Sequence, residues 1–377
     1  MKICWFGFLS KNHSWAKVSQ SLSREFIRMG HDVHLFSTNG ISNFPEDLKP
    51  NLKGFIEENS VPDVSKYKFP LDDSYEMQLS YTALKNFERF FNRGTKNRFG
   101  IWNYETTVLP PGFARNYKFV DQVLPSSNFS KQIFKDNGIP DKAQTVVPHG
   151  IYLEDFLNKE KYPLQTKKKI KFLANIAQPH LRKNIPGLLE AWGRAFTIND
   201  DVCLVIKISK KSPGKTLSMD VDFNQIYSSF KKKYKNHASV EIIEGFITDI
   251  EPLYNACDVV WTMSHAECWW MPGTEGMGAN KLVIAPRYGG QLDFMNDENS
   301  LLIDGKEIRA DVRMQYWNAN SPYAKVFEPD VNQAAKIIKE VANNYTDYHA
   351  KFSDNIKATA EKFTWNNAAK QIIDLCK

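Results

Sequence analysis

The sequence predicts an α/β protein made of two domains, each built on a doubly wound parallel sheet. Short apolar segments of strand type alternate with amphipathic helical segments in both halves of the chain, and such strand–helix–strand units favour parallel sheets. The 377 residues exceed the roughly 100–200 residues of an average domain. A Lys-rich segment near residue 160 separates the two alternations and predicts the link between the domains.

The first half opens with a β–α–β unit. Lys2–Leu9 is a short apolar run that predicts a buried strand. Trp15–Met29 has apolar residues at helical spacing, and the following Gly30 is a common helix end. His31–Ser37 then alternates as a strand does. The further elements predicted in this half are a helix, a strand, a strand end, a capped helix and a strand, at Tyr81–Phe91, Arg98–Tyr104, Gln122–Pro125, Ser126–Phe134 and Thr145–Pro148.

The second half repeats this organisation after a predicted linker at 157–171. The predicted strands are Ile170–Ile176, Val202–Ile208, Val240–Ile243, Val259–Met263 and Lys281–Ala285, and the predicted helices are Ile185–Phe196, Val331–Asn343, His349–Phe363 and Trp365–Cys376. We therefore expect an N-terminal domain over 1–160, onto which a final helix at 361–377 packs back, and a C-terminal domain over 165–360. In such sheets ligands bind beyond the carboxyl ends of the strands, in a cleft between the domains.

Composition excludes several classes of protein. The 49 basic and 43 acidic side chains give a net charge of +6, too weak for a protein that packages nucleic acid. Five cysteines, with no C-x-x-C pair, indicate reduced intracellular thiols rather than a disulfide framework or a zinc site. No stretch approaches ~18 consecutive apolar residues, and the N-terminal run lacks the features of a signal peptide. We expect a cytoplasmic protein, with peripheral contact at the inner face of a membrane left open.

The densest chemistry lies between residues 261 and 294. Glu267 and Glu275 are eight positions apart, and Pro272-Gly273-Thr274 between them forms a turn that can open a helix. Free N–H groups at such a helix start suit a phosphate, and a carboxylate at Glu275 can accept hydrogen bonds from a ribose diol. Glu267 follows a strand and is placed to meet sugar hydroxyls. The alternative interpretation is a capping glutamate and an unrelated surface glutamate.

This region resembles the donor-site signature of the retaining GT-B glycosyltransferases of glycosyltransferase family 4, roughly S-x-x-E-G-F-G-x-P-x-x-E-A-M followed by V-I-A and G-G. The residues in register are Ser264, Glu267, Pro272, Glu275, Met277, Val283, Ile284, Ala285, Gly289 and Gly290. Further similar segments are Gly245-Phe246, Leu253–Asp258, Ile101–Glu105, Leu109-Pro110, Val120-Asp121, Pro125-Ser126 and Val147–Gly150. The resemblance covers most of both domains. It implies two Rossmann-like domains facing a central cleft, the GT-B fold.

Two departures from the family pattern affect the donor site. Cys268-Trp269-Trp270 stands where the family has Gly-Phe-Gly, so two indoles would either stack on a sugar or belong to the core. The family also has an Arg and a later Lys that grip the diphosphate. Lys183 matches the Lys, but the Arg is absent, and Arg182 or Lys207 would replace its charge. Cations are disfavoured at a helix N-terminus, so Arg182-Lys183 favours a bound anion over a solvated helix start.

The acceptor side is predicted in the first domain. The polar loop after the first strand contains Asn12 and His13, where many relatives have a glycine-rich turn, and it is either an acceptor contact or a solvated connector. Asn103 and Glu105 end a strand that would face the cleft and orient an acceptor. We interpret His149, at the predicted interdomain turn, as a turn residue.

The resemblance implies a retaining hexosyl- or pentosyltransferase that uses a UDP- or GDP-linked sugar, with no metal and no other cofactor. Arg182, Lys183 and the Gly273–Thr274 turn would stabilise the departing diphosphate, with Pro272, Ser264 and Lys207 lining the donor site. Glu267 would hold the transferred sugar and Glu275 the ribose. In a front-face reaction, a diphosphate oxygen would take the proton of the acceptor hydroxyl.

Several alternatives stay open at this stage. The acceptor is expected to be a glycan or a lipid-linked glycan, because the lysine runs at 167–171 and 231–235 could meet anionic lipid. The same runs could meet DNA, as in enzymes that glycosylate a modified base in viral DNA, or they are solvated helix faces. A nucleotide-sugar epimerase and a catalytically inactive nucleotide-sugar-binding protein are rival functions. A dinucleotide oxidoreductase is disfavoured, because no G-x-G-x-x-G follows a strand.

Overall fold

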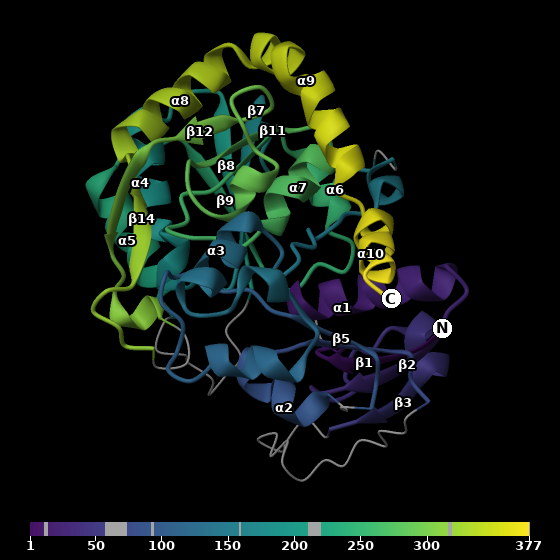
Figure 1. Ribbon diagram of the computed structural model, residues 1–377. Helices are drawn as coiled ribbons and strands as arrows, with labels where there is room; N and C mark the ends of the chain where they lie inside the picture. Colours follow the sequence, from purple (N-terminus) through teal and green to yellow (C-terminus); the bar gives the residue numbers. More distant parts are fainter. Residues whose placement is uncertain are drawn as a thin grey trace. The chain divides into compact units, whose positions relative to one another are not determined.

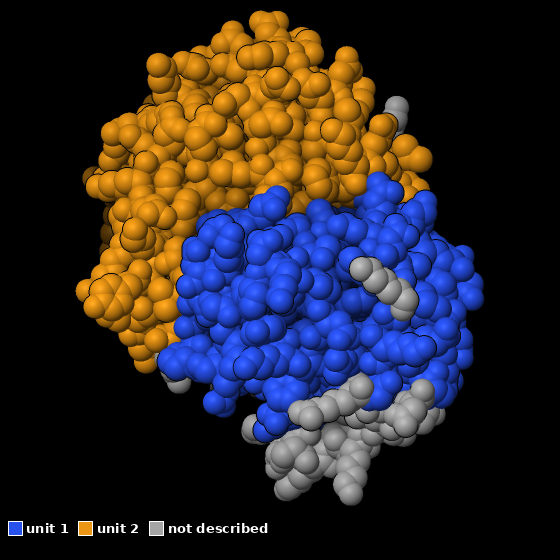
Figure 2. Space-filling view, in the orientation of Figure 1, with its two compact units in different colours: residues 1–104, 109–150, 364–377 blue, residues 105–108, 151–363 orange. Residues whose placement is uncertain are grey.

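The computed structural model describes residues 1–10, 14–56, 74–91, 94–157, 160–209, 220–315 and 319–376, which form two compact units (Figures 1 and 2). Unit 1 comprises Met1–Tyr104, Leu109–Gly150 and Thr364–Lys377, and unit 2 comprises Glu105–Val108 and Ile151–Phe363. The chain thus passes between the units at 104/105, 108/109, 150/151 and 363/364. The boundaries suggested by the sequence are near 160 and 361. Each unit contains one six-stranded sheet, which confirms the predicted α/β class.

Unit 1 is built on a parallel sheet with strand order β3-β2-β1-β4-β5-β6. Its strands are β1 (Lys2–Gly7), β2 (Asp32–Ser37), β3 (Leu52–Phe55), β4 (Met77–Tyr81), β5 (Asn97–Ile101) and β6 (Gln122–Leu124). Its helices are α1 (Ser14–Arg28), α2 (Phe87–Phe90), α3 (Asn128–Asp136) and α10 (Trp365–Asp374). Strand β1 pairs with β2 on one side and β4 on the other, and its apolar residues are buried, as in parallel sheets that are covered on both faces. The C-terminal α10 contacts α1, and Asn366 Nδ2 donates to Glu25 Oε2 at 3.1 Å.

Four elements of unit 1 differ from the sequence prediction. The helix predicted at Tyr81–Phe91 is wrong: β4 ends at Tyr81, and only a short 3-10 turn and α2 follow. The strand β4, with the sequence Met-Gln-Leu-Ser-Tyr, was itself missed, although it alternates apolar and polar residues and is buried at all five positions. The strand predicted at Thr145–Pro148 is also wrong, since only an isolated bridge joins Gln144 to Val123. Edge strand β3 was missed.

Unit 2 is built on a second parallel sheet with strand order β12-β11-β10-β7-β8-β9. Its strands are β7 (Ile170–Ala177), β8 (Val202–Ile208), β9 (Ser239–Glu244), β10 (Val259–Trp261), β11 (Leu282–Pro286) and β12 (Leu301–Ile303). Its helices are α4 (Ile185–Ala195), α5 (Phe223–Lys233), α6 (Glu251–Ala256), α7 (Met271–Gly278), α8 (Val331–Asn343) and α9 (Tyr345–Lys362). One large apolar core fills this unit, with β8 buried in every position.

A separate antiparallel hairpin also belongs to unit 2 and was not predicted. It consists of β13 (Gly305–Arg309) and β14 (Lys325–Pro329). Strand β13 reads Gly-Lys-Glu-Ile-Arg and is mostly exposed, so it carries no apolar alternation from which a strand could be recognised. A small apolar cluster of Ala266, Ala310, Met314, Ala324 and Val326 joins this region to the loop after β10.

The parallel sheet of unit 2 gives it two chemically different edges. The loops after β7 and β10, and the end of β8, bring Arg182, Lys183, Glu267 and Lys207 to the carboxyl edge. The lysine runs at 167–169 and 231–235 precede β7 and β9 and so lie at the opposite, amino edge. None of the described helices is both long enough and apolar enough to cross a bilayer.

Candidate functional site

A compact ion cluster around Glu267 forms the centre of the carboxyl edge of unit 2. Lys183 Nζ donates to Glu267 Oε1 at 2.6 Å, and Arg182 Nη1 lies 2.9 Å from Glu267 Oε2. All three side chains are mostly buried, with exposed fractions between 7% and 18%. The cluster therefore joins two residues before α4 to one residue after β10.

Local backbone geometry places the two cations. Arg182 and Lys183 lie in a 3-10 turn (Leu181–Lys183), and Asn184 follows with φ of 48° and ψ of 48°. Asparagine tolerates this left-handed conformation better than most residues. The Asn184 side chain caps α4 by accepting from Gly187 N at 3.1 Å. The cations thus stand just before a capped helix start, where only a nearby anion offsets the unfavourable helix dipole.

The electrostatics of the cluster keep Glu267 ionised. Burial acts to raise the pKa of this carboxyl, but the charges of Arg182 and Lys183, with hydrogen bonds from Lys183 and Ser264, lower the pKa to about 2. Ser264 also lies 2.9 Å from Thr262, oxygen to oxygen. Glu267 is therefore a fixed negative charge whose orientation is set from three sides.

Arg182 is shared with a second carboxylate, Glu105. Arg182 Nη2 lies 3.3 Å from Glu105 Oε1, and Arg182 Nη1 also donates to the carbonyl of Ala266. Burial raises the pKa of Glu105, and the charge of Glu267 acts in the same direction against the lowering effect of Arg182. The guanidinium that we expected to grip a diphosphate is thus engaged by two carboxylates and a carbonyl. Glu105, expected to orient an acceptor, belongs to unit 2.

His265 connects the loop that carries Glu267 to the β13–β14 hairpin. Its backbone N donates to Arg182 O at 2.8 Å, and its carbonyl accepts from Phe327 N at 2.9 Å. The ring Nδ1 lies 2.7 Å from Phe327 O, and burial lowers the pKa of the ring. A neutral His265 with its proton on Nδ1 donates to this carbonyl. Through His265 the hairpin is thus connected both to the loop that carries Glu267 and to the turn that carries Arg182.

The second predicted glutamate, Glu275, lies in a separate hydrogen-bonded chain. Tyr254 OH donates to Glu275 Oε2 at 2.5 Å, and Asn175 Nδ2 donates to Tyr254 OH at 3.0 Å. Tyr254 is fully buried and Glu275 is 5% exposed. Burial, reinforced by the charge of Glu275, raises the pKa of Tyr254 well above its usual value, which keeps the phenol protonated as a donor. Sequence reasoning missed Tyr254 as a site residue, because its hydrogen bond to Glu275 joins two different helices, α6 and α7.

The start of α7 differs in one respect from the phosphate cradle that we expected. Gly273 N donates to the carbonyl of Trp270 at 2.9 Å, and Pro272 has no N–H to offer. The Thr274 hydroxyl donates to Met271 O at 2.9 Å. Trp270 closes this turn with φ of 47° and ψ of 66°. The Gly273 N–H is therefore not free, because the left-handed Trp270 folds its own carbonyl back onto it.

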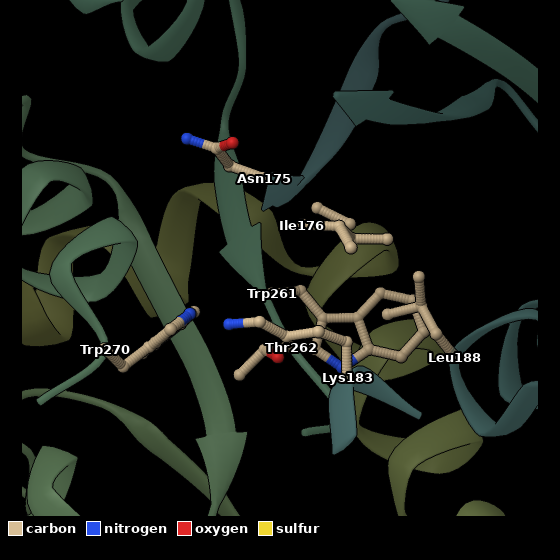
Figure 3. A pocket seen from close by; sticks show the side chains of 8 residues that line it. Asn175, Ile176, Lys183, Leu188, Trp261, Thr262 and Trp270 are labelled. Carbon is tan, nitrogen blue, oxygen red and sulfur yellow. The ribbon is translucent and has the colours of Figure 1, made fainter. Parts of the chain in front are cut away.

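The two neighbouring indoles have different surroundings. Trp269 is 1% exposed and packs against Phe294 and Phe363, with ring centroids 5.0 and 5.3 Å away, so it belongs to the core. Trp270 belongs to the same core cluster, but it also lines a crevice of about 10 Å³ together with Lys183, Asn175 and Thr262 (Figure 3).

Lys207 is the third cation of this edge. It lies near the end of β8, in register with Asn175 of β7, and is 6% exposed. Burial alone lowers its pKa. Within the described part of the chain no carboxylate or hydrogen-bond acceptor contacts its ammonium group. Buried lysines without a counter-charge are costly, so an anion at this edge would stabilise it.

The remaining acceptor-side predictions have separate outcomes. Asn12 and His13 lie outside the described residues. Asn103 is buried in unit 1, where its side chain accepts from Ser126 N at 2.8 Å and donates to Tyr81 OH at 3.1 Å. Asn103 Nδ2 also lies 3.3 Å from His149 Nε2, and burial lowers the pKa of His149 to about 3. His149 is thus part of a buried polar group rather than a simple turn residue.

Comparison with known proteins identifies the fold. No protein-family model and no curated protein sequence matches the chain. Among solved structures, HepE from Anabaena, in complex with UDP and glucose, has a TM-score of 0.70 at 15% identity and covers 99% of this chain and 98% of its own. Sucrose-phosphate synthase from Thermosynechococcus elongatus has a TM-score of 0.70 at 14% identity, with 99% and 98% covered.

A third solved structure, WaaG, is a glycosyltransferase involved in lipopolysaccharide biosynthesis. It has a TM-score of 0.64 at 11% identity and covers 100% of this chain and 99% of its own. At such low identity these likenesses establish the fold alone. The chain has the GT-B fold of glycosyltransferases over its full length.

Proposed function

We propose that this protein is a glycosyltransferase that transfers a sugar from a nucleoside-diphosphate donor to an acceptor hydroxyl with retention of anomeric configuration. The observation that carries the proposal is the ion cluster of Glu267, Lys183 and Arg182 at the carboxyl edge of unit 2. The structural neighbour HepE, which shares this fold, is a complex with UDP and glucose. Ligands of open α/β sheets bind at this edge.

The donor is held, on this proposal, by charges already in place. Departure of the nucleoside diphosphate develops negative charge, which preorganised cations stabilise. Lys183 has three N–H groups, of which one donates to Glu267, so it can also donate to the diphosphate. Lys207 supplies the second charge. The sequence left open whether Arg182 or Lys207 replaces the absent family arginine. Arg182 is engaged by Glu267 and Glu105, so its role is to position Glu267.

The two glutamates take different tasks. Glu267, ionised and held by Arg182, accepts hydrogen bonds from hydroxyls of the transferred sugar. Glu275, oriented by Tyr254, accepts from the ribose diol, and Ser264, Pro272 and Thr274 complete the wall around the donor. In the front-face reaction that we propose, the bond to the diphosphate breaks as the acceptor oxygen approaches the same face. A diphosphate oxygen then takes the acceptor proton, so no separate base is required.

The acceptor that we propose is a glycan or a lipid-linked glycan. WaaG, one of the neighbours in fold, acts in lipopolysaccharide biosynthesis. A DNA acceptor has weaker support, because the lysine runs at 167–169 and 231–235 stand at the amino edge of the sheet, away from Glu267. They are not placed to hold a DNA backbone at the donor site.

The proposal is tested with a panel of donors. Ligands that bind only the folded state raise its stability, by about 2.7 kcal/mol when present at 100 times Kd. We expect UDP or GDP, and their sugars, to raise the unfolding temperature, with the same result in EDTA because no metal is proposed. Transfer to a glycan acceptor should give a product with the anomeric configuration of the donor. A protein that binds none of these nucleotides is not a nucleotide-sugar transferase.

A further inference from the structure

The indole N–H of Trp270 takes no part in the ion cluster around Glu267. Trp270 is 4% exposed and lines the same crevice as Lys183. We propose that the indole N–H of Trp270 binds the donor diphosphate, by donating a hydrogen bond to an anionic oxygen that Lys183 contacts at the same time. This inference rests on the proposed function, because it assigns a further residue to the same donor site.

The first support is the direction of two hydrogen-bond donors. In Figure 3 the indole nitrogen of Trp270 and the ammonium nitrogen of Lys183 point toward one another across the crevice. Within the described residues no atom accepts a hydrogen bond from the Trp270 indole. An N–H dipole directed at a cation is unfavourable unless an acceptor lies between them, and an anionic oxygen satisfies both groups.

The size of the crevice supports the same ligand atom. Its volume of about 10 Å³ is close to that of one water molecule. It has no room for a sugar ring, but it accommodates a single oxygen that projects from a larger ligand. Asn175 and Thr262 also line it, and they connect it to the Tyr254–Glu275 chain and to Ser264 respectively. The crevice is thus a one-oxygen recess between the two glutamate networks.

The backbone of Trp270 adopts a left-handed conformation, which is energetically costly for a residue with a side chain. A residue with a side chain in the left-handed region costs roughly 1–2 kcal/mol, and the donor-site pattern resembled by this sequence has glycine here. The Trp270 ring also lies over Gly273, where an added Cβ would come within 2.3 Å of it. The carbonyl of Trp270 accepts a hydrogen bond from the Gly273 N–H. The indole N–H then supplies a phosphate donor in place of that backbone N–H.

The test compares Trp270→Phe with Trp269→Phe as a matched control. Both changes replace an indole with a phenyl ring, but Trp269 packs in the core against Phe294 and Phe363. Loss of one hydrogen bond to a charged group corresponds to about a ten- to hundredfold change in affinity. We expect Trp270→Phe to weaken UDP or GDP by this factor in calorimetric titrations, and Trp269→Phe to stay within about threefold of wild type.

The outcomes separate this inference from the proposed function. If wild type binds the nucleotide and Trp270→Phe binds it equally well, the assignment of Trp270 is wrong while the function stands. If Trp270→Phe binds the nucleotide sugar more weakly but binds UDP or GDP as tightly as wild type does, Trp270 contacts the sugar. That result would also overturn the assignment of Trp270 to the diphosphate. Wild type that binds no nucleoside diphosphate would contradict both. Trp270→His, which keeps a ring N–H, should recover part of the affinity and guards against a folding defect in the phenyl variant.

Discussion

At the scale of residues, the site is a set of charges with unequal surroundings. Glu267 and Glu105 both contact Arg182 and both are buried, yet their pKa values move in opposite directions. Lys183 adds a direct contact to Glu267 at 2.6 Å, whereas burial dominates at Glu105. Two carboxylates beside one guanidinium are therefore not interchangeable, and substitution of each has a different consequence.

Replacing Glu267 with Gln should destabilise the protein. Arg182 and Lys183 would lose their buried counter-charge, and breaking such a pair costs about 3–5 kcal/mol. Because the pKa of Glu267 is lowered to about 2, its contribution is present above the ordinary glutamate pKa of about 4.3 and is lost as the pH falls toward 2. Denaturant unfolding of Glu267→Gln at pH 7 measures this loss, and a cost below about 1 kcal/mol would contradict the ion-cluster assignment.

Replacing Glu105 with Gln should have the opposite pH dependence. Because burial raises the pKa of Glu105, the folded state binds more protons than the unfolded state above about pH 4.3. Wild-type stability therefore falls with pH until the raised pKa is passed, and the neutral amide removes this effect. Relative to wild type, Glu105→Gln should gain unfolding free energy between pH 5 and pH 8. If the unfolding free energy of wild type instead rises relative to Glu105→Gln over the same pH range, the charge of Arg182 has a larger effect on the pKa of Glu105 than burial does.

At the scale of elements, the β13–β14 hairpin supports the loop that carries Glu267. Its link is His265, which contacts Phe327 through both backbone and ring. The helices and strands of the sheets could largely be predicted, because buried apolar runs and 3.6-residue periodicity are local signals. The hairpin could not, since β13 is polar and exposed and its residues pair with residues of β14 that lie 16 to 24 positions away along the chain.

The link through His265 can be tested by a pair of variants. His265→Ala leaves the carbonyl of Phe327 without its ring donor, and an unsatisfied buried acceptor costs about 1–3 kcal/mol. His265→Asn keeps a donor of similar reach and should recover part of that loss. Urea unfolding of both variants against wild type measures the difference. Equal stability of His265→Ala and wild type would show that the ring does not brace the loop.

At the scale of the molecule, the chain forms two units, each with one six-stranded parallel sheet. The carboxyl edge of the sheet in unit 2 carries Glu267, Lys183 and Lys207. Sequence reasoning pointed to this edge because Glu267 and Lys183 follow predicted strands and Lys207 lies near the end of another, and these strands run in the same direction. It could not foresee that Arg182 would be engaged by two carboxylates, which lie 77 and 85 positions away along the chain. Nor could it foresee that Tyr254 would hold Glu275, which lies 21 positions away. Such pairings are set by tertiary packing.

The central claim is that Lys183, in the ion cluster of unit 2, binds the diphosphate of a nucleotide-sugar donor. The most direct measurement is calorimetric titration of UDP and GDP into wild type, Lys183→Ala and Lys232→Ala, the last a control at an exposed lysine of α5. Removal of a charge-assisted hydrogen bond should weaken binding at least about tenfold in Lys183→Ala, with Lys232→Ala equal to wild type. If Lys183→Ala binds the preferred nucleotide as tightly as wild type does, the donor site lies elsewhere.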